Sequence, residues 1–340
     1  MSALATRAAP GPEAESGWRE RAGLLIAQRE TVIAVLLGVE FLLFALFAEG
    51  FATSGNLGNV LRDSTQLGLI AAGMTLLIIQ GGIDVSVGSM LGVVAYAAGK
   101  LLTEGAAPLL VLVACVALGA LLGTTNGLLV TAARIPPIIA TLGTMNVWRA
   151  VIFILLAGEI LTGIPSFSPA LQEDSLAGVP LVFGLVIVVY VALWYLLRHR
   201  VFGRTLYAIG NNEEAARLAG LPVRRTRLLS YSLLGALVGL AALTYTMRVP
   251  SVEVTIAQDY ALLAIAAVVI GGASITGGTG SIVGTFMGVL FVAFLRNGLV
   301  VLGIPSLWEQ AALGAFILLS VGADQIVNRR RARRRIQRGS

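Results

Sequence analysis

The sequence has little of what metal centres, disulfide frameworks and most catalytic sites require. It holds one cysteine and one histidine among 340 residues, and only 12% of its residues are charged. Cys115 lies within an apolar run, so no disulfide framework is expected. A single histidine without cysteine pairs argues against a metal site, and we expect no cofactor. With no histidine or cysteine cluster and no paired carboxylates on one helix, a membrane enzyme has little support.

A nucleotide-binding loop is also missing. The glycine-rich run Gly277–Ser281 lacks the lysine that a phosphate-binding loop needs, and the only lysine of the chain is Lys100. We therefore expect that the chain cannot hydrolyse ATP by itself. Residues 1–30 are polar and mixed in charge, without the pattern of a cleaved signal peptide, and are expected to form a tail.

What the sequence has in abundance is apolar residues. They make up 57% of the chain, and the mean hydropathy is +0.88. Soluble domains carry about twice the charged fraction found here. Repeated apolar runs near the length that crosses ~30 Å of hydrocarbon predict an all-α, polytopic membrane protein. The 40 glycines suit close packing of helices in lipid.

Ten hydrophobic segments are predicted between a cytoplasmic tail (1–30) and a basic tail (326–340), within a membrane domain of residues 31–325. The second, third and eighth are short, so we expect them to be tilted, broken or partly re-entrant. The segments are Thr31–Ala48, Gln66–Gln80, Val87–Gly99, Pro108–Val130, Ile138–Ala157, Val179–Leu197, Leu228–Met247, Tyr260–Ile270, Ile282–Leu302 and Leu307–Val321.

The longest polar interval between these segments, Arg198–Arg227, sets the expected orientation. Short loops rich in arginine stay in the cytoplasm. With this interval inside, Arg134 and the basic tail also fall inside, whereas Gly158–Gly178, which has no arginine or lysine, falls outside. Both termini are then cytoplasmic, and the protein is expected in the inner cell membrane. This bias and anionic lipid headgroups explain the net charge of +6, which therefore indicates no nucleic acid.

A short helix is expected at the centre of the 198–227 interval. An asparagine cap, two acidic residues in the first turn, alanine and leucine within, and glycine as the stop describe a helix of two or three turns. It is either an ordinary amphipathic surface helix or a docking knob on which a cytoplasmic partner pushes. The residues predicted to make that contact are Asn212, Glu213, Glu214, Ala215, Ala216 and Gly220.

The most unusual stretch lies between the second and third segments. It places one carboxylate and two hydroxyls among glycines, in the residues Gly81, Gly82, Asp84, Ser86, Gly88 and Ser89. One interpretation is a tight turn in which Asp84 or Ser86 caps the third helix. The other is irregular backbone that is tolerated because it borders a cavity or a partner. The two interpretations are compatible.

The stretch Gly81–Ser89 resembles a motif of the permease subunits of bacterial ATP-binding-cassette (ABC) importers for ribose, xylose, galactose, rhamnose and autoinducer-2. The resemblance covers roughly Gly68 to Val321, and the combination of stretches is far more specific than any one of them. Leu221 and Pro222 follow Gly220 immediately, so the later part of the general importer docking motif is only loosely kept. The other similar stretches are Arg134–Pro136, Ala140–Met145 with Arg149, Phe202–Arg204, Gly210–Asn212, Glu214–Ala216, Val269–Gly272, Gly277–Ser281 and Gly284–Thr285.

The resemblance implies a type II ABC importer-like fold with about ten helices per subunit. It also implies a second permease subunit, from the same or a related chain, and two ATPase subunits that dock on the Asn212–Gly220 helix. A separate periplasmic or lipid-anchored binding protein would deliver the substrate. We expect it to rest on the two extended outer loops, Gly158–Gly178 and Arg248–Gln258. Membrane lipids complete the expected partners.

A candidate translocation path lies on the fifth segment. Thr141, Thr144 and Trp148 are spaced i, i+3 and i+7 and share one helical face, which suits either a neutral polyol or packing between helices. Arg149 lies past the midpoint of its helix, where a charge costs about 2.5–3.5 kcal/mol, so it should face protein or water. Glu40 meets the same cost in the first segment, and a Glu40–Arg149 pair is one option.

The sequence thus predicts the membrane subunit of an ABC importer that carries a small sugar or sugar-like signal by alternating access. Weak hydrogen bonds would select the substrate, because a transporter must release what it binds. One rival is a permease of the same broad type for branched-chain amino acids or nucleosides; a charged substrate would call for fixed counter-charges on the path. Another is an ion-driven secondary transporter, which would need carboxylates in its core and no ATPase.

Overall fold

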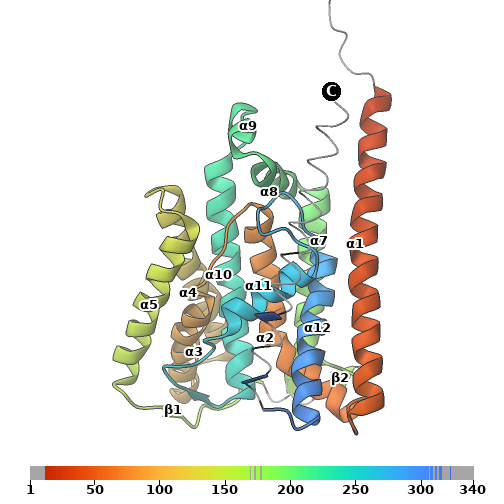
Figure 1. Cartoon of the computed structure of the whole chain (residues 1–340). Coiled ribbons are helices and arrows are strands. Elements are labelled where there is room, and N and C mark those ends of the chain that lie inside the picture. The colour runs from red at the N-terminus through yellow and green to blue at the C-terminus, as the bar shows by residue number, and fades with distance from the viewer. Residues whose placement is uncertain are drawn as a thin grey trace, which may run out of the picture.

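The computed structural model describes residues 12–168, 170–171, 174–176, 178–305, 307–308, 311, 314–315 and 322. These residues form a bundle of helices with short strands in the connections (Figure 1). The helices are α1 (Pro12–Phe47), α2 (Ser54–Ile79), α3 (Val87–Thr103), α4 (Pro108–Thr131), α5 (Pro137–Leu156), α7 (Leu181–His199), α8 (Val201–Asn211), α9 (Glu213–Leu218), α10 (Val223–Arg248), α11 (Tyr260–Ile270) and α12 (Ile282–Val301). The strands are β1 (Leu161–Thr162), β2 (Ser175–Leu176), β3 (Val179–Pro180) and β4 (Ser251–Val252).

The helices confirm a predominantly α-helical, multi-pass chain. Six described helices are long and apolar enough to cross a membrane by length and composition: Glu30–Phe47 within α1, and α4, α5, α7, α10 and α12. Helices α3 and α11 are apolar but shorter. Each of the first nine predicted segments coincides with part of a described helix, whereas the tenth, Leu307–Val321, lies mostly outside the described residues.

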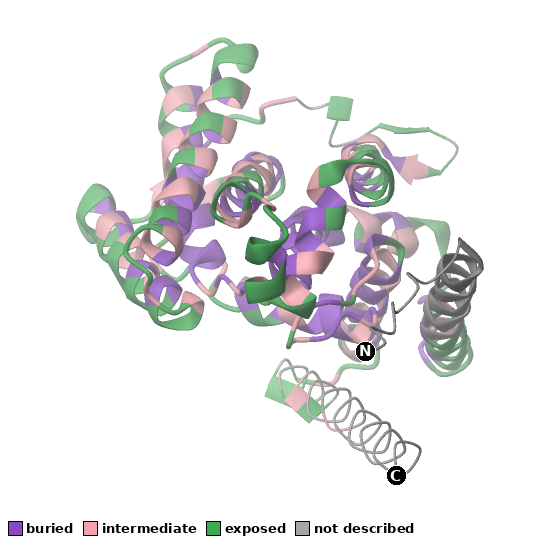
Figure 2. Cartoon of the chain, turned by 90° about the horizontal axis from the view of Figure 1, so that it is seen from above, coloured by how far each residue is buried: buried purple, intermediate pink, exposed green. Residues whose placement is uncertain are grey.

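Helix α2 is the core of the bundle. Every residue from Ser64 to Ile79 is buried, and α7, α10, α11 and α12 all contact this helix. Because lipid and water are both excluded from it, its side chains are apolar on nearly every face. Figure 2 shows the same pattern for the whole bundle, with buried residues at the centre and exposed ones on the outward faces.

The predicted start of α2 at Gln66 was wrong. The helix begins at Ser54, after Thr53, whose hydroxyl accepts the N–H of Asn56. The first turns of α2 are polar, so a prediction based on hydropathy does not include them.

Helices α4 and α10 approach each other along their glycines. A Cβ atom added at Gly119 or Gly123 would overlap a backbone carbonyl oxygen of α10, and one added at Gly235 or Gly239 would overlap a carbonyl oxygen of α4. Small residues are what allow helix backbones to come this close in lipid, where dispersion contacts replace the hydrophobic effect as the driving force.

The two ends of the bundle carry different structures (Figure 1). Strand β1 pairs antiparallel with β4, so that the loops Gly158–Gly178 and Arg248–Gln258 are joined at one end, while β2 pairs with β3 in the same region. Helices α8 and α9 lie at the opposite end, hereafter the arginine-rich end. Helix α8 was not predicted, because its few buried apolar residues, among them Leu206 and Ile209, are hidden in an interval that reads as polar.

Candidate functional site

Helix α9 is the short helix expected within the arginine-rich interval. Asn212 caps it, with its Oδ1 accepting the N–H of Ala215 at 2.9 Å. Gly220 follows the helix with a φ of +74°, the left-handed conformation typical of a helix stop. The predicted cap and stop are confirmed. The helix has only six residues, Glu213–Leu218, rather than two or three turns.

One side of α9 packs against α10, and the opposite side is exposed. Glu213 faces α10 and forms a bidentate ion pair with Arg227, with N···O distances of 3.0 and 2.8 Å. This planar pairing orients α9 on α10. Ala216 is buried, whereas Leu218 is 85% exposed and Glu214 is exposed. A leucine this exposed on an oriented helix is suited to contact with another protein.

Behind α9, the end of α8 meets two glycine turns. A Cβ atom at Gly210 would overlap the carbonyl oxygen of Ile79, at the end of α2, and the amide of Gly278, in the turn from α11 to α12. The N–H of Gly278 donates to the Ile79 carbonyl at 2.8 Å, and Asn211 Nδ2 donates to the Gly278 carbonyl at 3.2 Å. We call these four residues the glycine junction. Three segments distant in sequence meet there, backbone against backbone.

Tyr207 of α8 forms a side-chain hydrogen bond beside the glycine junction. Its hydroxyl donates to the carbonyl of Gly280 at 2.8 Å. Burial and the nearby Glu30 carboxylate raise the pKa of Tyr207 to about 12, so the phenol keeps its proton at neutral pH. Glu30 in turn accepts a hydrogen bond of 2.5 Å from Ser281, the N-cap of α12. Through these bonds the middle of α1 and helix α8 are both linked to the start of α12.

The turn between α2 and α3 is buried and carries a polar network. The Asp84 carboxylate accepts the Ser86 N–H at 2.8 Å, the Ser86 hydroxyl at 2.7 Å and Asn126 Nδ2 at 2.8 Å. The expectation that Asp84 or Ser86 caps α3 was wrong, because Ser86 occupies the cap position without a side-chain cap bond. The carboxylate instead ties the turn to α4.

The remaining residues of the predicted turn fall on both sides of this network. Gly81 has a φ of +80° where α2 ends, and it lies against Gly277 of the α11–α12 turn. Gly82 lies beside the hydroxyl of Tyr231. The Ser89 hydroxyl is buried and has no hydrogen-bond partner among the described residues.

The start of α3 lies against the connection between α10 and α11 (residues 249–259). A Cβ atom at Gly88 would overlap the carbonyl oxygen of Ala257. Arg149 of α5 donates to the carbonyl oxygens of Val254 and of Ile256, the latter at 3.1 Å. The structure therefore brings two predicted sites, the glycine-rich turn and Arg149, against one connection.

The other predicted path residues lie on α5 as expected. Thr141 and Thr144 are buried, and their hydroxyls donate to carbonyls of their own helix, at Pro137 and at Thr141, over 2.9 and 3.3 Å. The indole N–H of Trp148 is buried without a hydrogen-bond partner among the described residues. The role of this face in transport stays a prediction.

A Glu40–Arg149 pair does not form. Arg149 is engaged with the 249–259 connection, and the Glu40 carboxylate is buried without a hydrogen bond among the described residues. The reason is distance in the fold, because α1 and α5 stand at opposite edges of the bundle (Figure 1).

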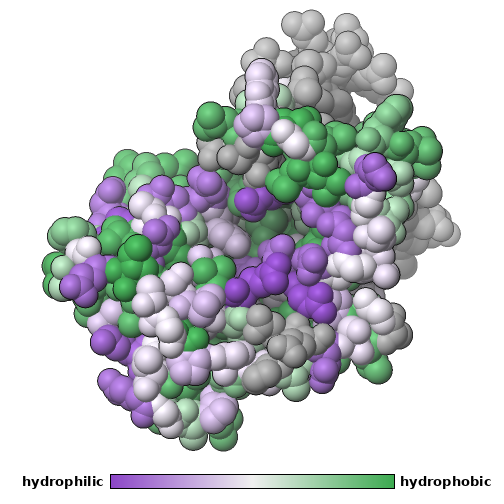
Figure 3. Space-filling model, turned by 90° about the horizontal axis from the view of Figure 1, so that it is seen from below, coloured by the Kyte–Doolittle hydropathy of each residue, from purple (hydrophilic) through white to green (hydrophobic). Residues whose placement is uncertain are grey.

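Sequence reasoning missed a polar cavity at the end of the bundle away from α9. It has a volume of about 340 Å³ and is enclosed by α2, α10, α11 and α12. Asp63 and Arg248 line it and form an ion pair at 2.8 Å, and Gln66, Tyr245 and Tyr260 add further polar atoms. Figure 3 views this end and shows hydrophilic residues around a hollow. Their polarity was visible in the sequence, but their convergence was not.

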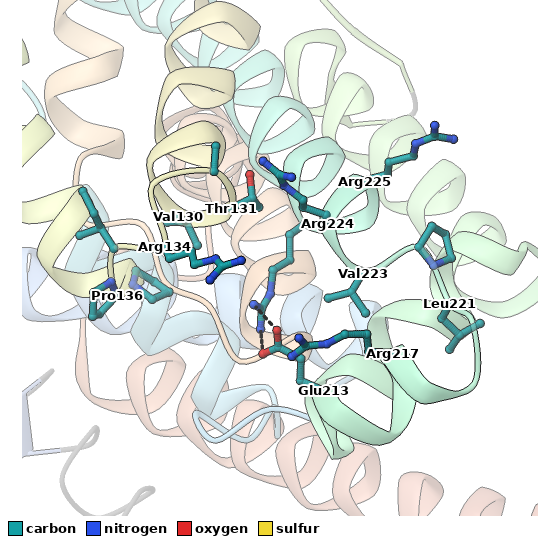
Figure 4. A pocket seen from close by; sticks show the side chains of 15 residues that line it. Val130, Thr131, Arg134, Pro136, Glu213, Arg217, Leu221, Val223, Arg224 and Arg225 are labelled. Atoms are coloured by element: carbon teal, nitrogen blue, oxygen red, sulfur yellow. Dashed lines mark hydrogen bonds and ion pairs between the residues drawn. The ribbon is translucent and has the colours of Figure 1, made fainter.

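A larger cavity, of about 820 Å³, lies beside α9 at the arginine-rich end (Figure 4). The turn joining α4 to α5, helix α9 and the first turns of α10 enclose it. Its one lining carboxylate, Glu213, is already paired with Arg227. The arginines that line it are Arg134, Arg217, Arg224, Arg225 and Arg227.

Comparison with known proteins decides the family. Residues 56–321 match the family described as the permease component of branched-chain amino acid transport systems. The chain belongs to this permease family. It is 39% identical over 272 residues to the ribose import permease protein RbsC of Bacillus subtilis, covering 79% of this chain and 84% of the relative.

Two further relatives of this permease are also import permeases. Identity to the ribose import permease protein RbsC of Escherichia coli K12 is 36% over 313 residues, covering 91% of this chain and 97% of the relative. Identity to the autoinducer 2 import system permease protein LsrC of Enterobacter sp. strain 638 is 37% over 263 residues, covering 77% and 76%. No solved structure shows significant similarity. The resemblance to permeases of sugar ABC importers is confirmed.

Proposed function

We propose that this permease is the membrane subunit of an ABC importer for a small neutral sugar or sugar-like signal, crossing the membrane about ten times. The observation that carries the proposal is the glycine junction. It joins the end of α8, which leads directly into α9, to the end of α2 and to the α11–α12 turn through close backbone contacts and the Asn211 side chain. The ribose and autoinducer-2 permeases among the relatives support the substrate class.

In this proposal, the arginine-rich end faces the cytoplasm. The distribution of arginine supports that orientation, because short loops rich in arginine are retained inside. Two ATPase subunits then press on α9 of this chain and of a second permease subunit. The β1–β4 end faces outward and receives the binding protein on the loops Gly158–Gly178 and Arg248–Gln258.

The proposed movement runs from α9 through α8 to the two glycine turns. Backbone packed against backbone has little room to yield, so a displacement of α8 moves the ends of α2 and of the α11–α12 turn together. The turn after α2 leads directly into Asp84 and then to Gly88, which lies against Ala257 of the outer connection. An ATP-driven push at one end is in this way coupled to the opposite end, as alternating access requires.

The substrate class follows from the chemistry of the polar cavity. Its one lining carboxylate among the described residues, Asp63, is paired with Arg248, and Arg296 adds a second guanidinium, so the lining suits an uncharged polyol better than a cation. Two tyrosines and Gln66 offer hydrogen bonds that a sugar could use and then release. The Thr141, Thr144, Trp148 and Arg149 face of α5 is the proposed continuation of this path.

A second candidate function is import of branched-chain amino acids, which the description of the family model favours. A zwitterion needs fixed charges of both signs. In the polar cavity, Arg296 adds a guanidinium for the carboxylate, but Asp63 would have to give up its contact with Arg248 to bind the ammonium group, which makes this candidate the weaker one.

Uptake into vesicles containing the permease, its ATPase subunit and its binding protein tests the proposal. Labelled ribose should accumulate only with ATP, should be unaffected by a protonophore, and should be displaced by other neutral sugars. Uptake that persists without ATP and collapses with the proton gradient would instead establish a secondary transporter. Displacement by leucine but not by sugars would establish the second candidate.

A further inference from the structure

The large cavity beside α9 lies at the level where membrane spans end. Its walls come from the last residues of α4, the first of α5 and the first turns of α10, all of which are candidate spans. Helix α9 forms the remaining wall with Glu213 and Arg217. The cavity therefore lies between the ends of three candidate spans and α9, where the headgroups of a surrounding bilayer would end.

Arginine side chains converge on this cavity without carboxylates to balance them. Arg134 from the α4–α5 turn, Arg217 from α9 and Arg224 from α10 all reach toward it (Figure 4). None of the three forms an ion pair among the described residues, since Glu213 is already taken by Arg227. Like charges held together repel one another, so an anion among them would be strongly stabilised.

Much of the remaining lining is apolar. Val130, Ile135, Pro136 and Leu221 form it, beside the guanidinium groups. A cavity with cationic and apolar walls at the end of membrane spans matches an amphiphile whose phosphate meets arginine and whose glycerol backbone meets hydrocarbon. Basic pockets between helices on the cytoplasmic side are known to take such headgroups.

We propose that this cavity binds the phosphate of an anionic phospholipid from the cytoplasmic leaflet, an assignment that rests on the proposed orientation of the permease. The lipid would join the α4–α5 turn to α9, two parts that the described residues do not otherwise connect by an ion pair. An acidic segment of the ATPase fits less well, because the apolar side chains of Val130, Ile135 and Leu221 beside the arginines match the hydrocarbon of a lipid rather than carboxylates.

Lipid retention by the purified chain tests the proposal. The full chain in neutral detergent would be incubated with phosphatidylglycerol or with phosphatidylcholine of the same acyl chains, and bound lipid counted by native mass spectrometry. Phosphatidylglycerol should be retained in preference. Arg134→Gln and Arg224→Gln should each weaken its retention about fivefold, since one arginine near a lipid phosphate contributes about 1 kcal/mol.

The matched control removes an arginine outside the cavity. Arg204 is exposed on α8 at the same end of the bundle and, unlike Arg225, does not line the cavity, so Arg204→Gln should retain phosphatidylglycerol as the wild type does. The thermal unfolding midpoint in phosphatidylcholine should be the same for all variants, which separates loss of binding from loss of fold.

Three results would overturn the proposal. Equal retention of the two lipids would show that the headgroup charge does not matter. If the double variant Arg134→Gln/Arg224→Gln retained phosphatidylglycerol as well as the wild type, the lipid would not bind in this cavity. Displacement of phosphatidylglycerol by an equal concentration of inorganic phosphate would make this a small-anion site. Because the measurement involves neither ATP nor sugar, its failure is separate from failure of the proposed transport function.

Discussion

The glycine junction and the 249–259 connection are held in different ways. The junction brings three segments together and leaves no space for even one methyl group at Gly210. The 249–259 connection has one backbone contact of this kind, between Gly88 and the Ala257 carbonyl, and otherwise depends on Arg149 and on the two-residue pairing of β1 with β4. A tightly packed end transmits a displacement, and an end held by few contacts can open. The proposed alternating access requires both.

The largest expected effect on stability comes from Gly210→Ala. The added methyl group overlaps backbone atoms of Ile79 and Gly278, which cannot rotate away, so we expect a loss of about 3 kcal/mol, the upper range for overpacking. Gly184→Ala in α7 is the control, because nothing lies within 4 Å of its Cβ position. Thermal unfolding in detergent measures both. Equal thermal unfolding midpoints for the two variants would show that the glycine junction can accommodate the added methyl group.

Arg149→Met tests the opposite end. Two backbone carbonyls of the 249–259 connection lose a charged donor, and we expect a loss of about 2 kcal/mol, as for hydrogen bonds to charged groups. Protease cleavage within residues 249–259 should become faster, while α8 and α9 stay protected. Asn146→Ala, whose side chain bonds only within α5, should change neither. Faster cleavage at α9 instead would mean that the two ends are not held independently.

Thr144→Val has a smaller effect on stability. The hydroxyl already donates within its own helix, so its removal should cost about 0.6 kcal/mol or less. If the α5 face belongs to the path, sugar uptake should still fall while assembly is unchanged. Normal uptake would assign the residue to packing alone.

Glu214→Ala has the smallest expected effect on stability, within about 0.5 kcal/mol, because its side chain is exposed on α9. ATP-driven uptake should nevertheless fall about tenfold, the size expected for losing one good interface contact. Glu104→Ala, an exposed carboxylate after α3, is the control and should transport normally. If Glu214→Ala also transported normally, the docking role of α9 would be untenable.

Local sequence signals predicted the parts of the molecule that neighbouring residues determine. Apolar length located the spans, and the Asn212 cap and Gly220 stop located α9, because a helix terminus is satisfied by residues within one turn of it. The same approach failed for α8 and for the start of α2. In both, tertiary burial supports a helix whose own residues read as polar.

The sequence by itself therefore determined that this is a helical membrane permease, where its apolar spans lie, and that a short capped helix sits among its arginines. Only the tertiary structure decided that Gly210 meets Ile79 and Gly278, that Arg149 donates to the 249–259 connection and not to Glu40, and that the arginines near α9 surround a cavity. The physical reason is the distance along the sequence over which each effect acts. Hydropathy and capping act between neighbours, whereas close backbone approach and the convergence of charges depend on how distant segments pack.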